Sequence, residues 1–160
     1  MIPFIDLKKV NQRFEQKFEL EFRDFLDTGH YILGNQVTKF ETNFAEFCGV
    51  QHCIGVGNGL DALRLILEGY KVLGKLNSGD EVLVASNTYI ATIIAIKQAG
   101  LTPVLVEAED QTYNFDVSAL KNKISSETKA IMPVHLYGLL SPMEEINALA
   151  EQHGLLVIED

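Results

Sequence analysis

The chain has 160 residues, of which 47% are apolar, and its 13 Lys and Arg against 22 Asp and Glu give a formal net charge of −9. A chain of this length can bury a hydrophobic core, either as one globular unit or as part of a larger one. The excess of negative charge argues against nucleic acids and anionic membranes as partners, because both are negatively charged themselves.

The sequence also disfavours a metal site and a membrane or secreted location. Cys48 and Cys53 match no metal or redox spacing, so we expect no metal ligands among them. No stretch approaches the ~20 apolar residues that span a bilayer. The N-terminus lacks the basic and apolar regions of a secretory signal. We therefore expect a soluble, cytoplasmic protein.

Residues 1–50 are predicted to form helices. The segment 11–29 carries phenylalanines at spacings of four, four and three residues, which places them on one helical face: Phe14, Phe18, Phe22 and Phe25. Gly29 is a natural stop for this helix. A second helix is predicted over 36–48, ending at Gly49, and it repeats the pattern with Phe40, Phe44 and Phe47. We interpret the aromatic stripe as a packing surface.

From residue 51 to residue 160, short apolar runs alternate with helical patterns. The runs are typical of buried strands and lie at 53–56, 81–85, 103–106, 130–134 and 155–158. Helical stretches separate most of them, at 61–73, 88–99, 117–123 and 142–153. This alternation predicts an α/β fold, a three-layer sandwich in which helices cover both faces of a mostly parallel sheet. In such sheets, ligands bind at the carboxyl edge of the strands.

Two glycine-containing segments are similar to nucleotide-binding motifs. Residues 69–76 nearly match the phosphate loop, but Leu76 replaces the hydroxyl residue that contacts Mg²⁺ and the segment ends a helix, so we reject it. Residues 57–62, GNGLDA, follow a strand and begin a helix, as a dinucleotide fingerprint does. That fingerprint also requires an acid at the end of the next strand, whereas Asp80 and Glu81 lie at its beginning. A nucleotide (NAD-like) binding module is therefore kept as an alternative.

The same segment can bind a phosphate without a dinucleotide. Gly57, Asn58 and Gly59 permit a tight turn, after which the amides of Gly59, Leu60 and Asp61 begin a helix. Free N–H groups and the positive end of the helix dipole favour a phosphate at this point. An ordinary strand–helix turn, capped by Asn58 or Asp61 and binding nothing, is the competing interpretation.

Two further residues lie at the same edge of the predicted sheet. Tyr89 follows the strand at 81–85, where it can stack on a planar ligand or merely cover the start of the next helix. Asp160 ends the fifth predicted strand, where a carboxylate can pair with a protonated ring nitrogen and stabilise that cation. A phosphate anchor, an aromatic plate and an acid for a pyridinium together describe pyridoxal 5′-phosphate (PLP) as the cofactor.

The whole chain resembles the DegT/DnrJ/EryC1/StrS family of PLP-dependent sugar aminotransferases, which have the aspartate-aminotransferase fold (fold type I). The matching segments, in chain order, are IPFIDLK, GHYILGNQVTKFETNFAEFCGV, VGNGLDALRLIL, GDEVLVASNTYIATIIAI, LTPVLVE, TYNFD, TKAIMPVHLYG and VIED. The segment GNGLDAL is most similar to enzymes that act on nucleotide-linked 3-keto-6-deoxyhexoses, whereas many relatives carry SGT in place of NGL. Motifs in this order indicate the N-terminal part of such an enzyme.

The resemblance implies roles for four residues. The phosphate-binding amides would belong to Gly59 and Leu60, the stacking aromatic would be Tyr89, and the partner of the pyridine nitrogen would be Asp160. Leu60 departs from the commoner threonine, so backbone contacts would have to hold the phosphate. No catalytic residue falls within the chain, because the family's Schiff-base lysine and its small C-terminal domain would follow Asp160. We expect His135, in the HLYG segment, to be structural.

The resemblance also implies an activity and an assembly. The parent protein would move an amino group, from glutamate, to a keto carbon of a nucleotide-linked deoxysugar, in a homodimer with shared active sites. The 160-residue chain by itself would be inactive. A pyridoxamine-dependent sugar dehydratase, with histidine in place of the lysine, is an alternative. The mixed sheet of fold type I places residues 53–57 beside strands beyond Asp160, so we expect this segment to lack its sheet neighbours.

Overall fold

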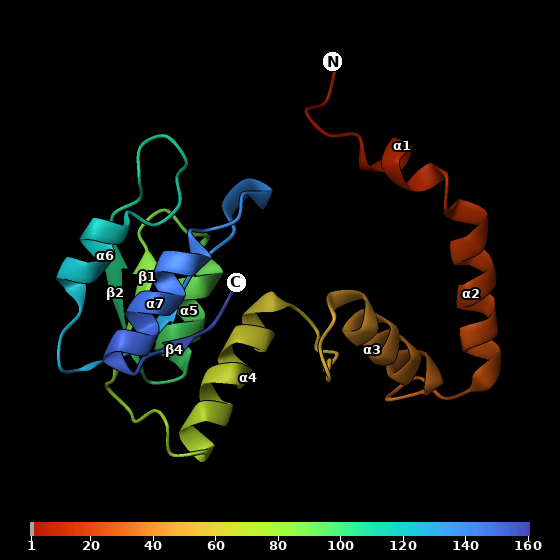
Figure 1. The fold of residues 1–160 in the computed structure, drawn as a ribbon. Coiled ribbons are helices and arrows are strands. Elements are labelled where there is room, and N and C mark those ends of the chain that lie inside the picture. The colour runs from red at the N-terminus through yellow and green to blue at the C-terminus, as the bar shows by residue number, and fades with distance from the viewer. Residues whose placement is uncertain (1) are drawn as a thin grey trace. The chain divides into compact units, whose positions relative to one another are not determined.

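The computed structural model describes residues 2–160 and contains two compact units, Met1–Gly55 and Val56–Asp160. The N-terminal unit consists of α1 (Leu7–Gln12), α2 (Glu15–Thr28) and α3 (Asn35–Cys48) (Figure 1). The helix expected over 11–29 is wrong at its start, because the chain turns between α1 and α2. There the N–H of Phe14, the N-cap of α2, donates to the carbonyl of Asn11 (2.8 Å), which is a tighter turn than the α-helical spacing.

The ends of α2 and α3 agree with the sequence. Gly29 and Gly49 follow these helices with φ angles of 62° and 67°, the left-handed conformation that glycine adopts most easily at a helix C-terminus. Both helices therefore stop where a glycine was expected to stop them.

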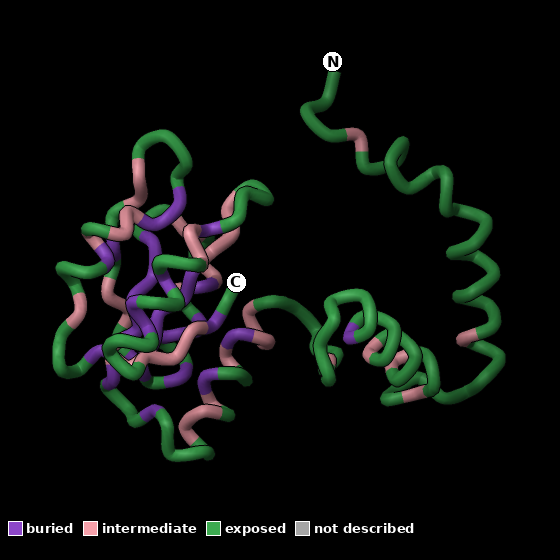
Figure 2. The backbone as a smooth tube through the Cα atoms, in the orientation of Figure 1, coloured by how far each residue is buried: buried purple, intermediate pink, exposed green. Residues whose placement is uncertain are grey.

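The aromatic stripe of the N-terminal unit is exposed. Figure 2 shows this unit as exposed almost throughout, and among residues 2–55 Ala45 is the one buried residue. The phenylalanine rings contact one another, with centroids 5.9 Å apart for Phe14 and Phe18 and 5.5 Å apart for Phe40 and Phe44. The expected packing against other elements is not observed in this unit, because α2 and α3 do not pack face to face.

The second unit has the α/β fold that the sequence predicts. Its sheet contains β1 (Glu81–Ala85), β2 (Thr102–Val106), β3 (Thr128–Met132) and β4 (Leu156–Val157) in the order β2-β1-β3-β4. Every pairing between these strands is parallel, so the part of the sheet within residues 2–160 is not mixed. The helices are α4 (Gly59–Val72), α5 (Ile90–Gln98), α6 (Val117–Lys123) and α7 (Met143–His153), with the 3₁₀ turn η1 at Leu136–Gly138.

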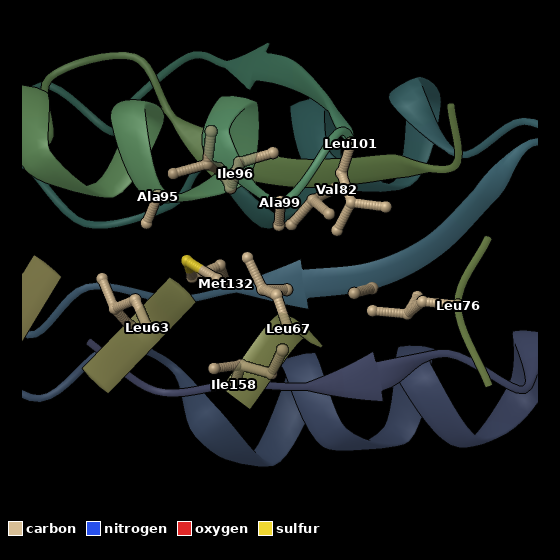
Figure 3. Close-up of a cluster of buried hydrophobic side chains, with 12 residues drawn as sticks. Leu63, Leu67, Leu76, Val82, Ala95, Ile96, Ala99, Leu101, Met132 and Ile158 are labelled. Carbon is tan, nitrogen blue, oxygen red and sulfur yellow. The ribbon is translucent and has the colours of Figure 1, made fainter. Parts of the chain in front are cut away.

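The helices cover the sheet on both faces, as Figure 1 shows. Alternate residues of β1 belong to different clusters of buried side chains, because successive side chains of a strand point to opposite faces. Val82 and Val84 pack with α4 and α5, and Figure 3 shows Leu67 and Ile96 of those helices turned toward this cluster. Leu83 packs on the other face with α6 and α7. The predicted three-layer arrangement is therefore observed.

One predicted strand is wrong. Residues 53–56 form neither a strand nor a bridge, and Ile54 is 81% exposed. A strand needs a partner for its backbone N–H and C=O groups. Among residues 2–160, β4 pairs with β3 alone, so the segment 53–57 lacks a sheet neighbour, as expected from the family's sheet order. An apolar run without a neighbouring strand thus stays irregular here.

Among the described residues, no helix combines the length and the apolar character that crossing a bilayer requires.

Candidate functional site

A cavity of about 590 Å³ lies at the carboxyl edge of the sheet in the second unit. Its walls come from the start of α4, the first turn of α5, and the segments that follow β3 and β4. All four residues selected from the sequence line it, namely Gly59, Leu60, Tyr89 and Asp160. They are separated by up to about a hundred residues along the chain, and the parallel sheet brings them to one place because the carboxyl ends of its strands share an edge.

The start of α4 presents two unpaired backbone amides. Asn58 is the N-cap, and its side-chain oxygen accepts a hydrogen bond from the N–H of Asp61 (2.9 Å). The sequence suggested three available amides, but this cap occupies that of Asp61. Within residues 2–160, the N–H groups of Gly59 and Leu60 have no hydrogen-bond partner. These two amides are therefore available to a ligand in the cavity.

The geometry around Gly59 leaves room for such a ligand. A Cβ atom built on Gly59 would meet no other atom within 4 Å, so the space beside the helix start is open. The first amides of α4 point away from the helix body, and the aligned peptide dipoles place a partial positive charge there. An anion with several acceptor oxygens, such as a phosphate monoester, matches this pair of donors.

Tyr89 lies at the N-terminus of α5. It is the N-cap of that helix, with an extended backbone (φ −64°, ψ 140°) that delays the helix start from the expected residue 88 to Ile90. Its side chain makes no capping hydrogen bond, and the residue is 75% exposed while lining the cavity. A phenol ring placed in this way offers an aromatic face to a planar ligand.

Asp160 is held at the cavity by its backbone and by its side chain. The N–H of Asp160 donates to the carbonyl of Pro133 (2.9 Å), and the carbonyl of Asp160 accepts from the N–H of His135 (3.1 Å). These bonds extend the pairing of β3 with β4 beyond the strands. The carboxylate oxygen Oδ2 accepts a hydrogen bond from the hydroxyl of Thr92 (2.5 Å).

Two threonines in this site were not selected from the sequence. Thr92 is 1% exposed and lies in the first turn of α5, and its hydroxyl is 2.8 Å from that of Thr88. Both residues line the cavity. The signal in the sequence is their spacing of four residues at a helix start, which places them on one face, but spacing alone does not indicate Asp160 as the partner.

His135 makes structural contacts and does not line the cavity, although its neighbours Val134 and Leu136 do. The Nδ1 atom of its ring accepts from the N–H of Ser141 (3.1 Å). Its Nε2 atom lies 2.9 Å from Oε2 of Glu159, and with Nδ1 acting as an acceptor this nitrogen is the donor. The ring therefore supports the loop after β3, in line with the structural role expected for it.

The acids near the start of β1 lie away from this cavity. Asp80 accepts a hydrogen bond from the N–H of Asn77 (2.7 Å), and Glu81 accepts from the hydroxyls of Ser125 and Thr128. These partners lie at the amino ends of the strands, opposite the cavity. No described acid at the end of β1 could hold the ribose of a dinucleotide, since Ala85 ends that strand and Ser86, Asn87 and Thr88 follow it.

The chain is similar to known proteins over nearly its whole length. Over its whole length the chain is 51% identical to the dTDP-3-amino-3,6-dideoxy-alpha-D-galactopyranose transaminase of Aneurinibacillus thermoaerophilus, and the match covers 43% of that relative. The solved structure of DesV from S. venezuelae superposes with a TM-score of 0.93 at 39% identity, covering 99% of this chain and 42% of that one. A more distant structure is that of the E. coli GDP-4-keto-6-deoxy-D-mannose-3-dehydratase with bound hydrated PLP. Its TM-score is 0.81 at 28% identity, covering 86% of this chain and 36% of that one.

The family assignment follows from a match that spans most of the chain. The model of the DegT/DnrJ/EryC1/StrS aminotransferase family matches residues 12–160. The chain spans less than half the length of the relatives it matches. Its parallel sheet and covering helices closely match this part of fold type I. The chain belongs to the DegT/DnrJ/EryC1/StrS aminotransferase family.

Proposed function

We propose that the cavity at the carboxyl edge binds PLP. The observation that carries this proposal is the convergence of Gly59, Leu60, Tyr89 and Asp160 on one cavity. Two unpaired amides at a helix start suit a phosphate, an exposed aromatic ring suits a flat heterocycle, and a carboxylate suits a protonated ring nitrogen. When bound, PLP supplies an electron sink for reactions at an amine-bearing carbon.

Each of these residues has a distinct part in this proposal. The N–H groups of Gly59 and Leu60 bind the phosphate, and the side chain of Leu60 contributes no hydroxyl, so the backbone alone makes these contacts. Tyr89 packs against the ring and fixes its plane. Asp160 accepts a hydrogen bond from the ring nitrogen and holds a proton there. We place the Schiff-base lysine outside residues 1–160, so we expect no amino transfer from this chain alone.

We further propose that the whole protein moves an amino group from glutamate to a keto carbon of a nucleotide-linked deoxysugar, such as a dTDP-3-keto-6-deoxyhexose. The support for this substrate class is the 51% identity to a transaminase whose name contains a dTDP-linked 3-amino-3,6-dideoxy sugar. A homodimer with shared active sites belongs to the same proposal.

The test uses the protein encoded by the complete reading frame that contains residues 1–160, called here the complete gene product. It is incubated with PLP, ¹⁵N-labelled glutamate and a dTDP-linked keto-deoxyhexose, and the sugar product is analysed by mass spectrometry. The proposal predicts an amino sugar that carries the label. If the protein binds PLP but forms no labelled amino sugar from any nucleotide-linked keto sugar, the proposed activity is contradicted. The proposed cofactor site is not contradicted by that result.

A pyridoxamine-dependent dehydratase is the second candidate, favoured by the likeness to the E. coli dehydratase at 28% identity. The residue at the Schiff-base position of the complete gene product distinguishes the two, because the resemblance implies lysine for the transaminase and histidine for the dehydratase. The much higher identity to a named transaminase favours the first.

An NAD-like module is disfavoured, because the acid it needs is absent from the end of β1. Binding of NAD without any response to PLP would reverse that preference.

A further inference from the structure

The carboxylate of Asp160 uses its two oxygens differently. Oδ2 accepts the hydroxyl of Thr92 at 2.5 Å, whereas Oδ1 has no hydrogen-bond partner among residues 2–160. An ionised carboxylate accepts hydrogen bonds at both oxygens, so Oδ1 retains its full capacity for a ligand. Since Asp160 lines the cavity, this capacity is available at the proposed cofactor site.

The hydrogen bonds that reach Oδ2 have a defined direction. A threonine hydroxyl carries one proton, and that of Thr92 is donated to Asp160. In the contact of 2.8 Å between Thr88 and Thr92, the donor must then be Thr88. The result is a chain of two hydrogen bonds, from Thr88 to Thr92 and from Thr92 to Asp160. Thr92 lies in the first turn of α5, which the buried residues Ala95 and Ile96 anchor in the core. Thr88 lies just before that helix, and its N–H donates to the carbonyl of Ala85 (3.3 Å).

Burial makes this arrangement rigid. Thr92 is 1% exposed, and a β-branched side chain in a helix has few accessible rotamers. The Thr92 hydroxyl can donate to Asp160 or to Thr88, and the hydrogen bond to the charged carboxylate is the stronger of the two, so it is maintained. The position of Thr92 therefore limits the rotation of the Asp160 carboxylate about its Cβ–Cγ bond.

We propose that Thr92 is a positioning residue for the cofactor, which holds Oδ2 of Asp160 so that Oδ1 faces the ring nitrogen of PLP, with Thr88 orienting the Thr92 hydroxyl. This inference rests on the proposed cofactor site. It gives a function to Thr88 and Thr92, which are not among the residues proposed to contact the phosphate, the ring face or the ring nitrogen. Without the Thr92 hydroxyl, the carboxylate can rotate and the hydrogen bond at the ring nitrogen weakens.

The experiment measures the ring nitrogen directly. The complete gene product is loaded with PLP labelled with ¹⁵N in the ring, and the ¹⁵N NMR signal reports how far that nitrogen is protonated. For Thr92→Val, which removes the hydroxyl and keeps the shape, we expect a signal moved toward the neutral ring. We expect the affinity for PLP to fall by up to about tenfold, the effect of losing the whole hydrogen bond between Oδ1 and the ring nitrogen. For Thr92→Ser, which restores a hydroxyl, we expect a return toward the wild-type signal.

A matched control comes from the opposite edge of the same sheet. Thr128 is 2% exposed, and its hydroxyl donates to the carboxylate of Glu81 (3.1 Å). Thr128→Val therefore removes the same kind of bond and lowers the thermal unfolding midpoint, but we expect the ¹⁵N signal to stay at its wild-type value. If Thr92→Val does not fold, Thr88→Val replaces it, with a smaller shift in the same direction and an affinity lowered about threefold.

The outcomes separate the two proposals. A folded Thr92→Val protein with the wild-type ¹⁵N signal and affinity would overturn the role of Thr92, and an unchanged signal in Thr88→Val would overturn the role of Thr88. A wild-type protein that does not bind PLP, or that binds it with a neutral ring nitrogen, would instead overturn the proposed cofactor site.

Discussion

The substitution of proline for Gly59 is expected to have opposite effects on cofactor affinity and on stability. Gly59 is the first residue of α4, and its N–H has no partner within residues 2–160. Proline is favoured at the first helical position, because the N–H it lacks is not needed by the helix. The preceding residue, Asn58, has an extended backbone (φ −167°, ψ 170°), and a residue before proline favours the extended region over the helical one. The structure therefore accommodates Gly59→Pro.

The magnitudes follow from what the substitution removes. One hydrogen bond to a charged phosphate is lost, which costs about 1.5–3 kcal/mol, or about 10- to 150-fold in the Kd for PLP. The unfolded chain loses conformational freedom, which raises the free energy of unfolding by about 0.4–1 kcal/mol. Gly59→Ala is the matched control. It keeps the N–H and adds the same Cβ as proline, which meets no protein atom within 4 Å, so it should bind PLP more tightly than the proline variant.

The assay is a titration of each complete gene product with PLP, followed by absorbance, together with urea unfolding of the proteins without cofactor. We expect the proline variant to be at least as stable as wild type and to bind PLP more weakly than the alanine variant. If the proline and alanine variants bind PLP with equal affinity, the phosphate does not bind at the start of α4 and the reasoning fails.

Three further predictions concern the ring, the core and a surface carboxylate. Tyr89→Phe should keep the PLP affinity, whereas Tyr89→Leu should weaken it about 2- to 10-fold in the same titration, because stacking is lost; equal affinities would argue against stacking. Leu67→Ala, at a 0% exposed position, should lower the free energy of unfolding by about 2–5 kcal/mol in urea. Leu65→Ala, on the same helix but 47% exposed, should lower it far less, and equal losses would contradict the packing described here. Hydrogen bonds from the side chain of Thr112 and from backbone N–H groups lower the pKa of Glu109 below its ordinary value. Because the folded-state pKa is the lower one, the stabilisation is fully present above the unfolded-state pKa and is lost as the pH falls through the folded-state pKa. Glu109→Gln should therefore lower the thermal unfolding midpoint at neutral pH and not in strong acid, and a loss independent of pH would refute the assignment.

The fold class could be predicted because its signals are local. The apolar runs at 81–85 and 103–106 have nearly the same bounds as β1 and β2 in the structure, since a buried parallel strand is apolar on both faces. The run at 53–56 has a similar composition but no strand partner within residues 2–160. Composition indicates which segments can form strands, whereas pairing decides which segments do.

The candidate site was predictable in part for a similar reason. Gly59, Tyr89 and Asp160 follow or end predicted strands, so the rule that parallel strands share a carboxyl edge was enough to bring them together. Thr92 could not be found in this way, because the carboxylate that it contacts lies 68 residues further along the chain. The capping of the Asp61 amide by Asn58 was one of two local alternatives, and only the geometry decides between them.

The most direct test of the central claim is a crystal structure of the complete gene product with PLP. We predict that the phosphate accepts hydrogen bonds from the N–H groups of Gly59 and Leu60, that the ring lies against Tyr89, and that its nitrogen faces Oδ1 of Asp160. A cofactor bound elsewhere, or bound here with its phosphate away from the start of α4, would contradict the account.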